Sequence, residues 1–202
     1  ARAAALARRN ITRLEGDFAR DRFGMAQFPA VYSRTVLALS VAETGEFAEG
    51  IARGEEAIRL AEALDHAHTL IFGCLGLGLL WNRKGDFERA IAVLERAFDL
   101  CWTADVPVVM STVAAPLASS FARVGRADEA AQLLALAVKR AISIGDPFGR
   151  WLRTAGLAEA YLVSRRTQEA LPLAHRALEI ARAVKSGGTE THALLLLAEV
   201  CA

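Results

Sequence analysis

The chain has 202 residues, 53% of them hydrophobic, which is enough to bury a sizeable core. Its formal net charge is only +1, so no overall basic bias favours nucleic acid or an anionic membrane as a partner. No stretch reaches the roughly 18 unbroken apolar residues of a membrane span, and Ala1–Arg9 lacks the layout of a secretory signal. These features indicate a cytoplasmic protein that binds neither nucleic acid nor membrane.

Cysteine and lysine usage agree with that location. The three cysteines, Cys74, Cys101 and Cys201, form no close pair, and each has apolar helical neighbours. We therefore expect small buried side chains rather than disulfides or metal ligands, in a reducing compartment. Only three of the 24 basic residues are lysines, a skew that together with abundant alanine suggests a GC-rich bacterial genome.

An internal repeat of forty residues organises the chain. A glycine recurs as Gly45, Gly85 and Gly125, with Arg165 in the fourth slot. A leucine followed by a tiny residue recurs as Leu37-Ala38, Leu77-Gly78, Leu117-Ala118, Leu157-Ala158 and Leu197-Ala198. Such periodicity indicates a repeat protein, in which each unit buries its apolar face only against its neighbours.

Residues 1–24 read as half a repeat. The segment Ala3–Arg20 is expected to form one helix with Ile11, Leu14 and Phe18 on its buried face. These positions match the second helix of a later repeat minus eighty residues, and the chain begins without Met. The sequence is therefore interpreted as a fragment of a longer chain.

Four whole repeats should follow at 25–64, 65–104, 105–144 and 145–184. Each contains two helices joined near the recurrent glycine, which tolerates the left-handed backbone that ends a helix. Asp65, Asp105 and Asp146 are expected to cap the following helices, and Asp86 to cap the second helix of its own repeat. The expected helices are 26–43, 47–64, 66–83, 87–102, 107–124, 127–144, 147–164 and 167–184.

Residues 185–202 complete the pattern as a further half repeat, with a first helix from about Thr189. The whole chain is thus predicted to be a single all-α domain, 1–202, of ten antiparallel helices. Pro116 and Pro172 fall inside helices, where a missing amide hydrogen either kinks the helix or is tolerated.

The order of small and aromatic residues resembles the tetratricopeptide repeat (TPR). The motif appears as Leu77-Gly78, Trp81, Gly85-Asp86-Phe87, Ala90 and Ala97. The resemblance spans nearly the whole chain and implies an alpha-alpha superhelix. The chain departs from the family in having forty residues per repeat where thirty-four is common. Its longer form is similar to repeats in large bacterial regulators, including ATP-dependent transcription activators and nucleotide cyclases.

The family resemblance implies a protein- or peptide-binding groove lined by the first helix of each repeat. Phe72, Leu75 and Leu79 are either groove residues or residues buried by neighbouring repeats. Arg83 and Arg123, one repeat apart, either hold acidic residues of a partner or are ordinary solvated charges. The candidate partner-binding residues are Tyr32, Leu39, Phe72, Leu75, Leu79, Asn82, Arg83, Ser119, Arg123, Leu152 and Glu159.

No constellation of residues indicates catalysis, a cofactor or a metal. The glycine-rich run Gly73–Gly78 lies in a helical pattern with no preceding strand, so close packing explains it better than a phosphate loop. Asp65–His68 offers two imidazoles without a third ligand, and His175 and His192 are isolated. The sequence therefore predicts a non-enzymatic module.

Three functions remain open at this point. The leading hypothesis is a protein- or peptide-binding scaffold that serves as the interaction or sensor arm of a larger bacterial regulatory protein. The second is a solenoid that senses a small ligand in a signalling ATPase, transcription activator or cyclase. The third is self-assembly into a homo-oligomer through the open ends of the stack.

Overall fold

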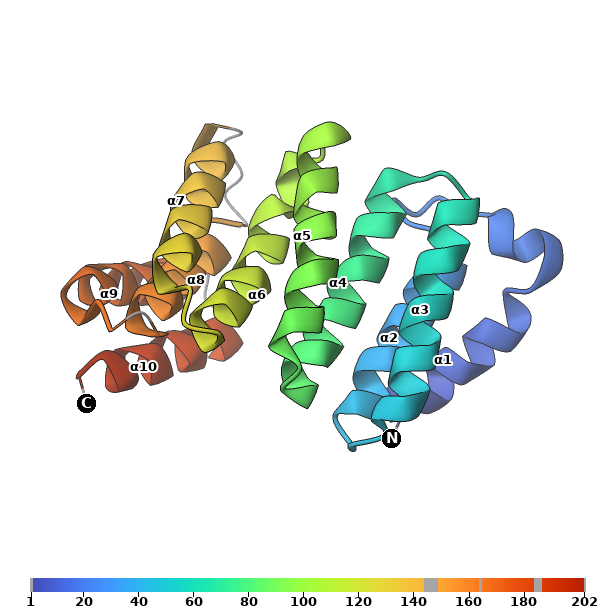
Figure 1. Cartoon of the computed structure of the whole chain (residues 1–202), viewed down its shortest axis with the longest axis horizontal. Helices are drawn as coiled ribbons and strands as arrows, with labels where there is room; N and C mark the ends of the chain where they lie inside the picture. The colour runs from blue at the N-terminus through green and yellow to red at the C-terminus, as the bar shows by residue number, and fades with distance from the viewer. Residues whose placement is uncertain (1, 144–148, 164, 184–186, 202) are drawn as a thin grey trace. The chain divides into compact units, whose positions relative to one another are not determined.

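The protein is all helical and divides into two compact units. The computed structural model describes residues 2–143, 149–163, 165–183 and 187–201 (Figure 1), and these contain ten α-helices, two 3-10 helices and no strand. The units are Ala1–Val106 and Pro107–Ala202. The all-α prediction is confirmed. The division falls two residues after the expected boundary between the second and third repeats.

The first unit is a stack of antiparallel helix pairs. In it α2 packs against α3 and also directly against α4, while α1 packs on α2. First helices therefore contact one another along an inner row, and second helices lie outside them. The elements are α1 (Arg2–Arg13), η1 (Gly16–Arg20), α2 (Pro29–Ala42), α3 (Phe47–Ala63), α4 (Ala67–Lys84) and α5 (Phe87–Thr103).

The second unit repeats this arrangement. Its central helix α8 contacts α6, α7, α9 and α10, so α6, α8 and α10 form the inner row. The elements are η2 (Pro107–Val109), α6 (Met110–Arg123), α7 (Ala127–Ser143), α8 (Gly149–Val163), α9 (Thr167–Ala183) and α10 (Gly187–Cys201).

The turn between the helices of a repeat has the same backbone conformation each time. Gly45, Gly85 and Gly125 have φ of 82°, 83° and 85°, and Arg165 in the fourth slot has φ of 56°. The next amide donates to the carbonyl five residues back, as from Asp86 N to Trp81 O at 3.0 Å. The left-handed turn predicted from the glycine pattern is therefore confirmed, including the position where glycine is absent.

The leucine and small-residue pairs form the core of each helix pair. Leu37, Leu77, Leu117 and Leu157 are 1–8% exposed. Their neighbours Ala38, Ala118 and Ala158 are fully buried, and a Cβ on Gly78 would lie 2.4 Å from Leu94 Cγ. Helix axes approach too closely there for a larger side chain. In α10 the pair is half-buried Leu197 and exposed Ala198, where the described residues include no second helix.

The glycine-rich run of α4 serves helix packing. A Cβ on Gly76 would lie 2.2 Å from Thr35 Cγ2 of α2, so only glycine allows the two inner helices to approach this closely. Gly73 faces Ile58 of α3, and Gly76 is buried. The packing interpretation of this run is confirmed.

The N-terminal segment differs from its prediction. The expected single helix Ala3–Arg20 ends at Arg13, because Gly16 adopts φ of 57° and the chain continues as η1. Phe18, expected on the buried face, is 61% exposed and stacks on Phe23 at 6.3 Å between ring centroids. The buried residues of α1 are instead Ala4, Ala7 and Ile11.

Two of the expected aspartate caps are wrong. Asp65 and Asp105 have φ of 48° and 49°, so they end α3 and α5 in the left-handed conformation. His66 caps α4, with Nδ1 accepting from Thr69 N at 3.3 Å. Asp86 caps α5 as predicted, accepting from Arg89 N at 3.4 Å. Asp146 lies outside the described residues.

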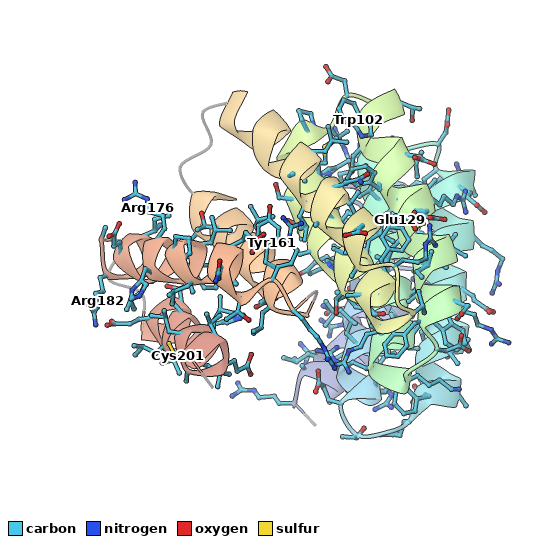
Figure 2. The ribbon with its side chains drawn as sticks, turned by 60° about the vertical axis from the view of Figure 1, so that its left-hand side comes forward. Trp102, Glu129, Tyr161, Arg176, Arg182 and Cys201 are labelled. Atoms are coloured by element: carbon cyan, nitrogen blue, oxygen red, sulfur yellow. The ribbon has the colours of Figure 1, made fainter. Side chains whose placement is uncertain are left out.

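The prolines and cysteines complete the comparison. Pro116 and Pro172 lie inside α6 and α9, each of which continues through its proline. Cys74 and Cys101 are buried, and burial raises the pKa of their thiols to about 11 and about 12. Cys201, expected to be buried, is exposed near the end of α10 (Figure 2). Within the described part of the chain, no helix is both long and apolar enough to cross a membrane.

Candidate binding groove

A hollow lies on the inner row of the second unit. It has a volume of about 250 Å³ and is formed by one face each of α6, α8 and α10. The first helices of three successive repeats therefore meet at one site. Its lining residues are Ala115, Ser119, Gly156, Glu159, Leu162, His192, Leu195, Leu196 and Glu199.

The repeat places equivalent residues side by side in this hollow. Ser119, Glu159 and Glu199 are spaced by forty residues and occupy one helical slot, which in the first unit is filled by Leu39 and Leu79. Three equivalent side chains, one from each of three successive repeats, thus line the same hollow.

The floor and walls are apolar. Gly156 of α8 is buried, and a Cβ built on it would lie 3.4 Å from Ala115 Cβ of α6. Helices α6 and α8 therefore lie close together at these two small residues, and both residues line the hollow. Leu162, Leu195 and Leu196 form the surrounding walls.

A hydrogen-bonded pair sits at the polar edge. His192 Nε2 donates to Glu159 Oε1 at 2.5 Å, so His192 is not isolated as the sequence indicated. The imidazole meets the Trp151 ring edge to face, with ring centroids 5.4 Å apart. The buried Trp151 Nε1 has no hydrogen-bond partner among the described residues. The contact with Trp151 and the hydrogen bond to Glu159 together restrict the orientation of the His192 ring.

The polar lining is acidic. Glu159 and Glu199 contribute two carboxylates, Ser119 one hydroxyl and His192 one imidazole, and neither Lys nor Arg is among the lining residues whose side chains are described. A carboxylate accepts hydrogen bonds and cannot donate them. Among the described polar groups of the hollow, the two carboxylates therefore offer hydrogen-bond acceptors and a negative charge.

Predicted groove residues of the first unit are exposed to different degrees. Tyr32 is 43% exposed, whereas Leu39, Phe72 and Leu79 are half-buried. Leu75 is only 6% exposed, so most of its surface belongs to the core. This supports the buried alternative for Leu75 and leaves Phe72 and Leu79 partly accessible.

The remaining predicted residues are polar or undescribed. Arg83 is exposed and pairs at 2.5 Å with Glu43, the residue that follows α2, so its charge is already matched within the chain. Asn82 is half-buried and Arg123 is exposed. The side chain of Leu152 lies outside the described residues. Among the predicted residues whose side chains the structure describes, Ser119 and Glu159 are the two that line the hollow.

Aromatic rings connect the start of α2 with the inner face of α4. Phe28 meets His66, His66 meets His68, and His68 meets Phe72, with centroids 5.4, 6.4 and 5.2 Å apart. Burial, with help from nearby Arg22 and His68, lowers the pKa of His66. His66 and His68 are therefore half-buried and pack against aromatic rings, and His66 also caps α4.

A second hollow, of about 270 Å³, lies beside the outer helix α7 of the second unit. It is lined mainly by α7, with Tyr161 of α8 lying beside that helix (Figure 2), and by Arg166. Because it lies outside the inner row, it does not join the predicted groove. Its lining residues are Asp128, Ala131, Gln132, Ala135, Tyr161 and Arg166.

The sequence-based set missed the contribution of α10. His192, Leu195 and Glu199 occupy the helical slots of Leu152, Ala155 and Glu159 one repeat later. The forty-residue register of the fourth repeat, extended to the final half repeat, identifies all three residues.

Comparisons with known proteins identify the fold. No protein-family model matches the sequence, and neither does any curated protein. The solved structure of BtubC (BKLC) from P. vanneervenii matches with a TM-score of 0.79 at 19% identity, over 98% of this chain and 82% of that one. The TPR-like repeats of a putative kinesin light chain from P. anserina match with a TM-score of 0.61 at 18% identity, over 92% and 96%.

A third similar structure is a Rap protein complexed with Competence and Sporulation Factor. It matches with a TM-score of 0.62 at 14% identity, over 98% of this chain and 57% of that chain. All of these identities are low, so the likeness concerns the fold. The chain therefore has the fold of the TPR-like helical repeat proteins, and its inner row of first helices presents the candidate groove.

Proposed function

We propose that this chain is a protein- or peptide-binding scaffold module and serves as the interaction arm of a larger bacterial regulatory protein. The observation that carries the proposal is the hollow where α6, α8 and α10 meet. It combines leucine walls with a few polar groups, the composition typical of sites that bind a ligand in a defined orientation.

The size of the hollow favours a peptide side chain over a free metabolite. Pockets that enclose drug-sized ligands usually measure about 300 to 1,000 Å³, and this one measures about 250 Å³. A peptide needs only one or two side chains inserted, while the rest of its length contacts the neighbouring helix faces. A small-ligand sensor is the alternative, and saturable thermal stabilisation by a metabolite would favour it.

The first unit offers an apolar surface of the same type. Tyr32 is exposed, and Phe72 and Leu79 are half-buried on the inner helices α2 and α4. Aromatic and aliphatic anchors of this kind supply most of the binding energy at protein interfaces. We propose that they bind further apolar residues of a partner.

Similar proteins offer one precedent. The Rap protein with this fold was solved in complex with Competence and Sporulation Factor. That complex supports the proposal that a helical stack with this fold can hold a ligand, although the present chain spans only 57% of the Rap chain. Experiment must identify the ligand of the present chain.

Selection from a random peptide display library on the immobilised whole chain tests the proposal. Selected peptides should bind with micromolar dissociation constants, measured by fluorescence anisotropy. Ser119→Phe should weaken them at least about tenfold, because the exposed Ser119 lines the hollow and a phenyl ring there would fill it.

Gln168→Phe is the matched control. It places the same ring at an exposed position of α9 that does not line the hollow. Peptide affinities should match those of the unchanged chain. The proposed function is wrong if selection yields no saturable binder, or if both variants bind every selected peptide equally well.

A further inference from the structure

We infer that the hollow of the second unit receives the side chain of an arginine or lysine from the bound peptide. This rests on the proposed function, since it specifies which residue of the partner enters that site. Three independent features of the site lead to it: its charge, its wall chemistry and the hydrogen-bonding state of its carboxylates.

The charge of the lining comes first. Glu159 and Glu199 face the same small volume from α8 and α10, and the lining residues that the structure describes include neither Lys nor Arg. Glu159 is half-buried and hydrogen-bonded to His192, and Glu199 is exposed. Both carboxylates would attract an incoming cation, whereas an acidic side chain would add a third negative charge.

The walls match the shape of a basic side chain. Lys and Arg bury a long apolar stem and keep a charged head at a polar site. Leu162, Leu195 and Leu196 line the same hollow as Glu159 and Glu199. Apolar side chains beside carboxylates are complementary to the two parts of this class of side chain.

The carboxylates retain acceptor capacity. His192 Nε2 donates to one oxygen of Glu159, and no hydrogen bond or ion pair links Glu199 to another described residue. The second oxygen of Glu159 and both oxygens of Glu199 are available. An arginine has five N–H donors in a planar fork and can engage two carboxylates at once.

The repeat explains why the site is confined to this unit. The slot that carries Glu159 and Glu199 carries Leu39 and Leu79 in the first unit, which cannot accept hydrogen bonds from a cation. A partner with one basic residue among apolar ones would therefore find its charge partner in the second unit alone, among the described inner helices.

Capped pentapeptides of the form acetyl-Ala-Leu-X-Leu-Ala-amide test the inference with the whole chain. X is arginine, lysine, citrulline, norleucine or glutamate, and binding is followed by titration calorimetry and by NMR shifts at millimolar peptide. Citrulline has the shape of arginine without its charge. The arginine peptide should bind about tenfold or more tightly than the citrulline peptide, and the difference should shrink as salt is added.

Variants locate the effect. Glu159→Gln and Glu199→Gln should each reduce the preference for arginine over citrulline, and Glu199→Lys should shift the preference toward the glutamate peptide. Glu190→Gln is the control, because Glu190 lies on α10 but pairs with Arg182 rather than lining the hollow. It should leave the preference unchanged.

The outcomes separate the two proposals. Equal affinity for the arginine, citrulline and norleucine peptides, with all three blocked by Ser119→Phe, would overturn the cationic anchor and leave peptide binding intact. The inference also fails if no pentapeptide binds, or if the preference survives both glutamine variants. Library selection tests the proposed function independently of any chosen residue.

Discussion

A single backbone angle limits which residue each intra-repeat turn can accept. The turn slot has φ between 56° and 85° in all four repeats, a region that L-residues occupy at a cost of about 1 kcal/mol or more. Three repeats meet the requirement with glycine, and the fourth uses Arg165. The strain is tolerated there because the helices on both sides fix the turn.

Arg165→Gly should therefore stabilise the chain by about 0.5 to 1 kcal/mol, since it removes the penalty at φ of 56°. Urea unfolding measures the change. Gly125→Arg, the reverse change at an equivalent turn with φ of 85°, should destabilise by a similar amount. Opposite signs in these two variants are required; a destabilising Arg165→Gly would contradict the strain argument.

The closest helix contact sets the second residue-scale prediction. Leu117 is 1% exposed and Ala118 is fully buried. Leu117→Ala should cost about 2 to 5 kcal/mol through a cavity, and Ala118→Leu about 1 to 3 kcal/mol through overpacking. Thermal melting of both variants, compared with the exposed-site change Ala135→Leu on α7, tests them. Melting at the unchanged temperature would contradict the assigned register.

At the scale of the element, one device recurs at the turns. Arg126 stacks on Phe121 at 4.2 Å and pairs with Glu129 at 2.7 Å, and Arg166 does the same with Tyr161 and Glu169. In the second repeat the acidic residue precedes the arginine in the sequence: Arg89 stacks on Trp81 and pairs with Asp86. Each aromatic ring beside a turn is thus covered by a guanidinium held by an acid.

Helix capping yields the element-scale prediction. His66 Nδ1 accepts from Thr69 N, which requires an unprotonated nitrogen, and burial lowers the pKa of His66. A lowered pKa means that the folded state resists protonation, so stability is full above about pH 6.5 and declines as the pH falls below it. The loss should approach about 1 kcal/mol, the usual contribution of an N-cap.

His66→Asn keeps a capping side chain that does not titrate, so unfolding free energies measured from about pH 8 to 5 should decline less than in the unchanged chain. His175→Asn, at an exposed position of α9, should leave the decline unaltered. An identical pH profile for all three proteins would show that His66 does not contribute.

Most helices could be predicted because two independent signals agreed: a forty-residue period and turn chemistry. The expected α3 (47–64) is observed as Phe47–Ala63, and α5 (87–102) as Phe87–Thr103. The prediction failed where only apolar spacing was available. Phe18 has the right spacing for a buried residue, but Gly16 ends that helical arrangement before it.

At the scale of the whole molecule, apolar side chains remain on the surface of both units. Phe18 is 61% exposed, Leu194 46% and Leu195 58%. Such side chains favour contacts between chains when they cluster. They support the earlier expectation of homo-oligomers, which stays a proposal.

The chain should accordingly associate with increasing concentration, as sedimentation velocity would record. Phe18→Ser combined with Leu194→Ser should shift the distribution toward monomer, because both changes remove exposed apolar surface. Tyr32→Ser is a useful control, since Tyr32 is also exposed but lies on the inner row. A monomer at every concentration in the unchanged chain would contradict this prediction.

The candidate site could be predicted only in part from the sequence. The family register correctly placed Ser119 and Glu159 on first helices, yet it could not show that α6, α8 and α10 leave a hollow between them. A hollow depends on how the three helices pack, for example on the close approach of Gly156 and Ala115, and a residue register does not give that packing. Leu75 shows the converse, a groove slot that packing buries.

The shared slot of Ser119, Glu159 and Glu199 has a consequence for how such a protein can change over time. On the first helices of the two units, this slot is occupied in chain order by Leu39, Leu79, Ser119, Glu159 and Glu199. One residue per repeat therefore sets whether this position is apolar, polar or acidic. Unequal recombination that gains or loses one forty-residue unit preserves the spacing of the turns and changes the series of residues at this slot. Ligand preference can then evolve by exchange of whole repeats, while the helix packing and turns of the remaining repeats stay the same.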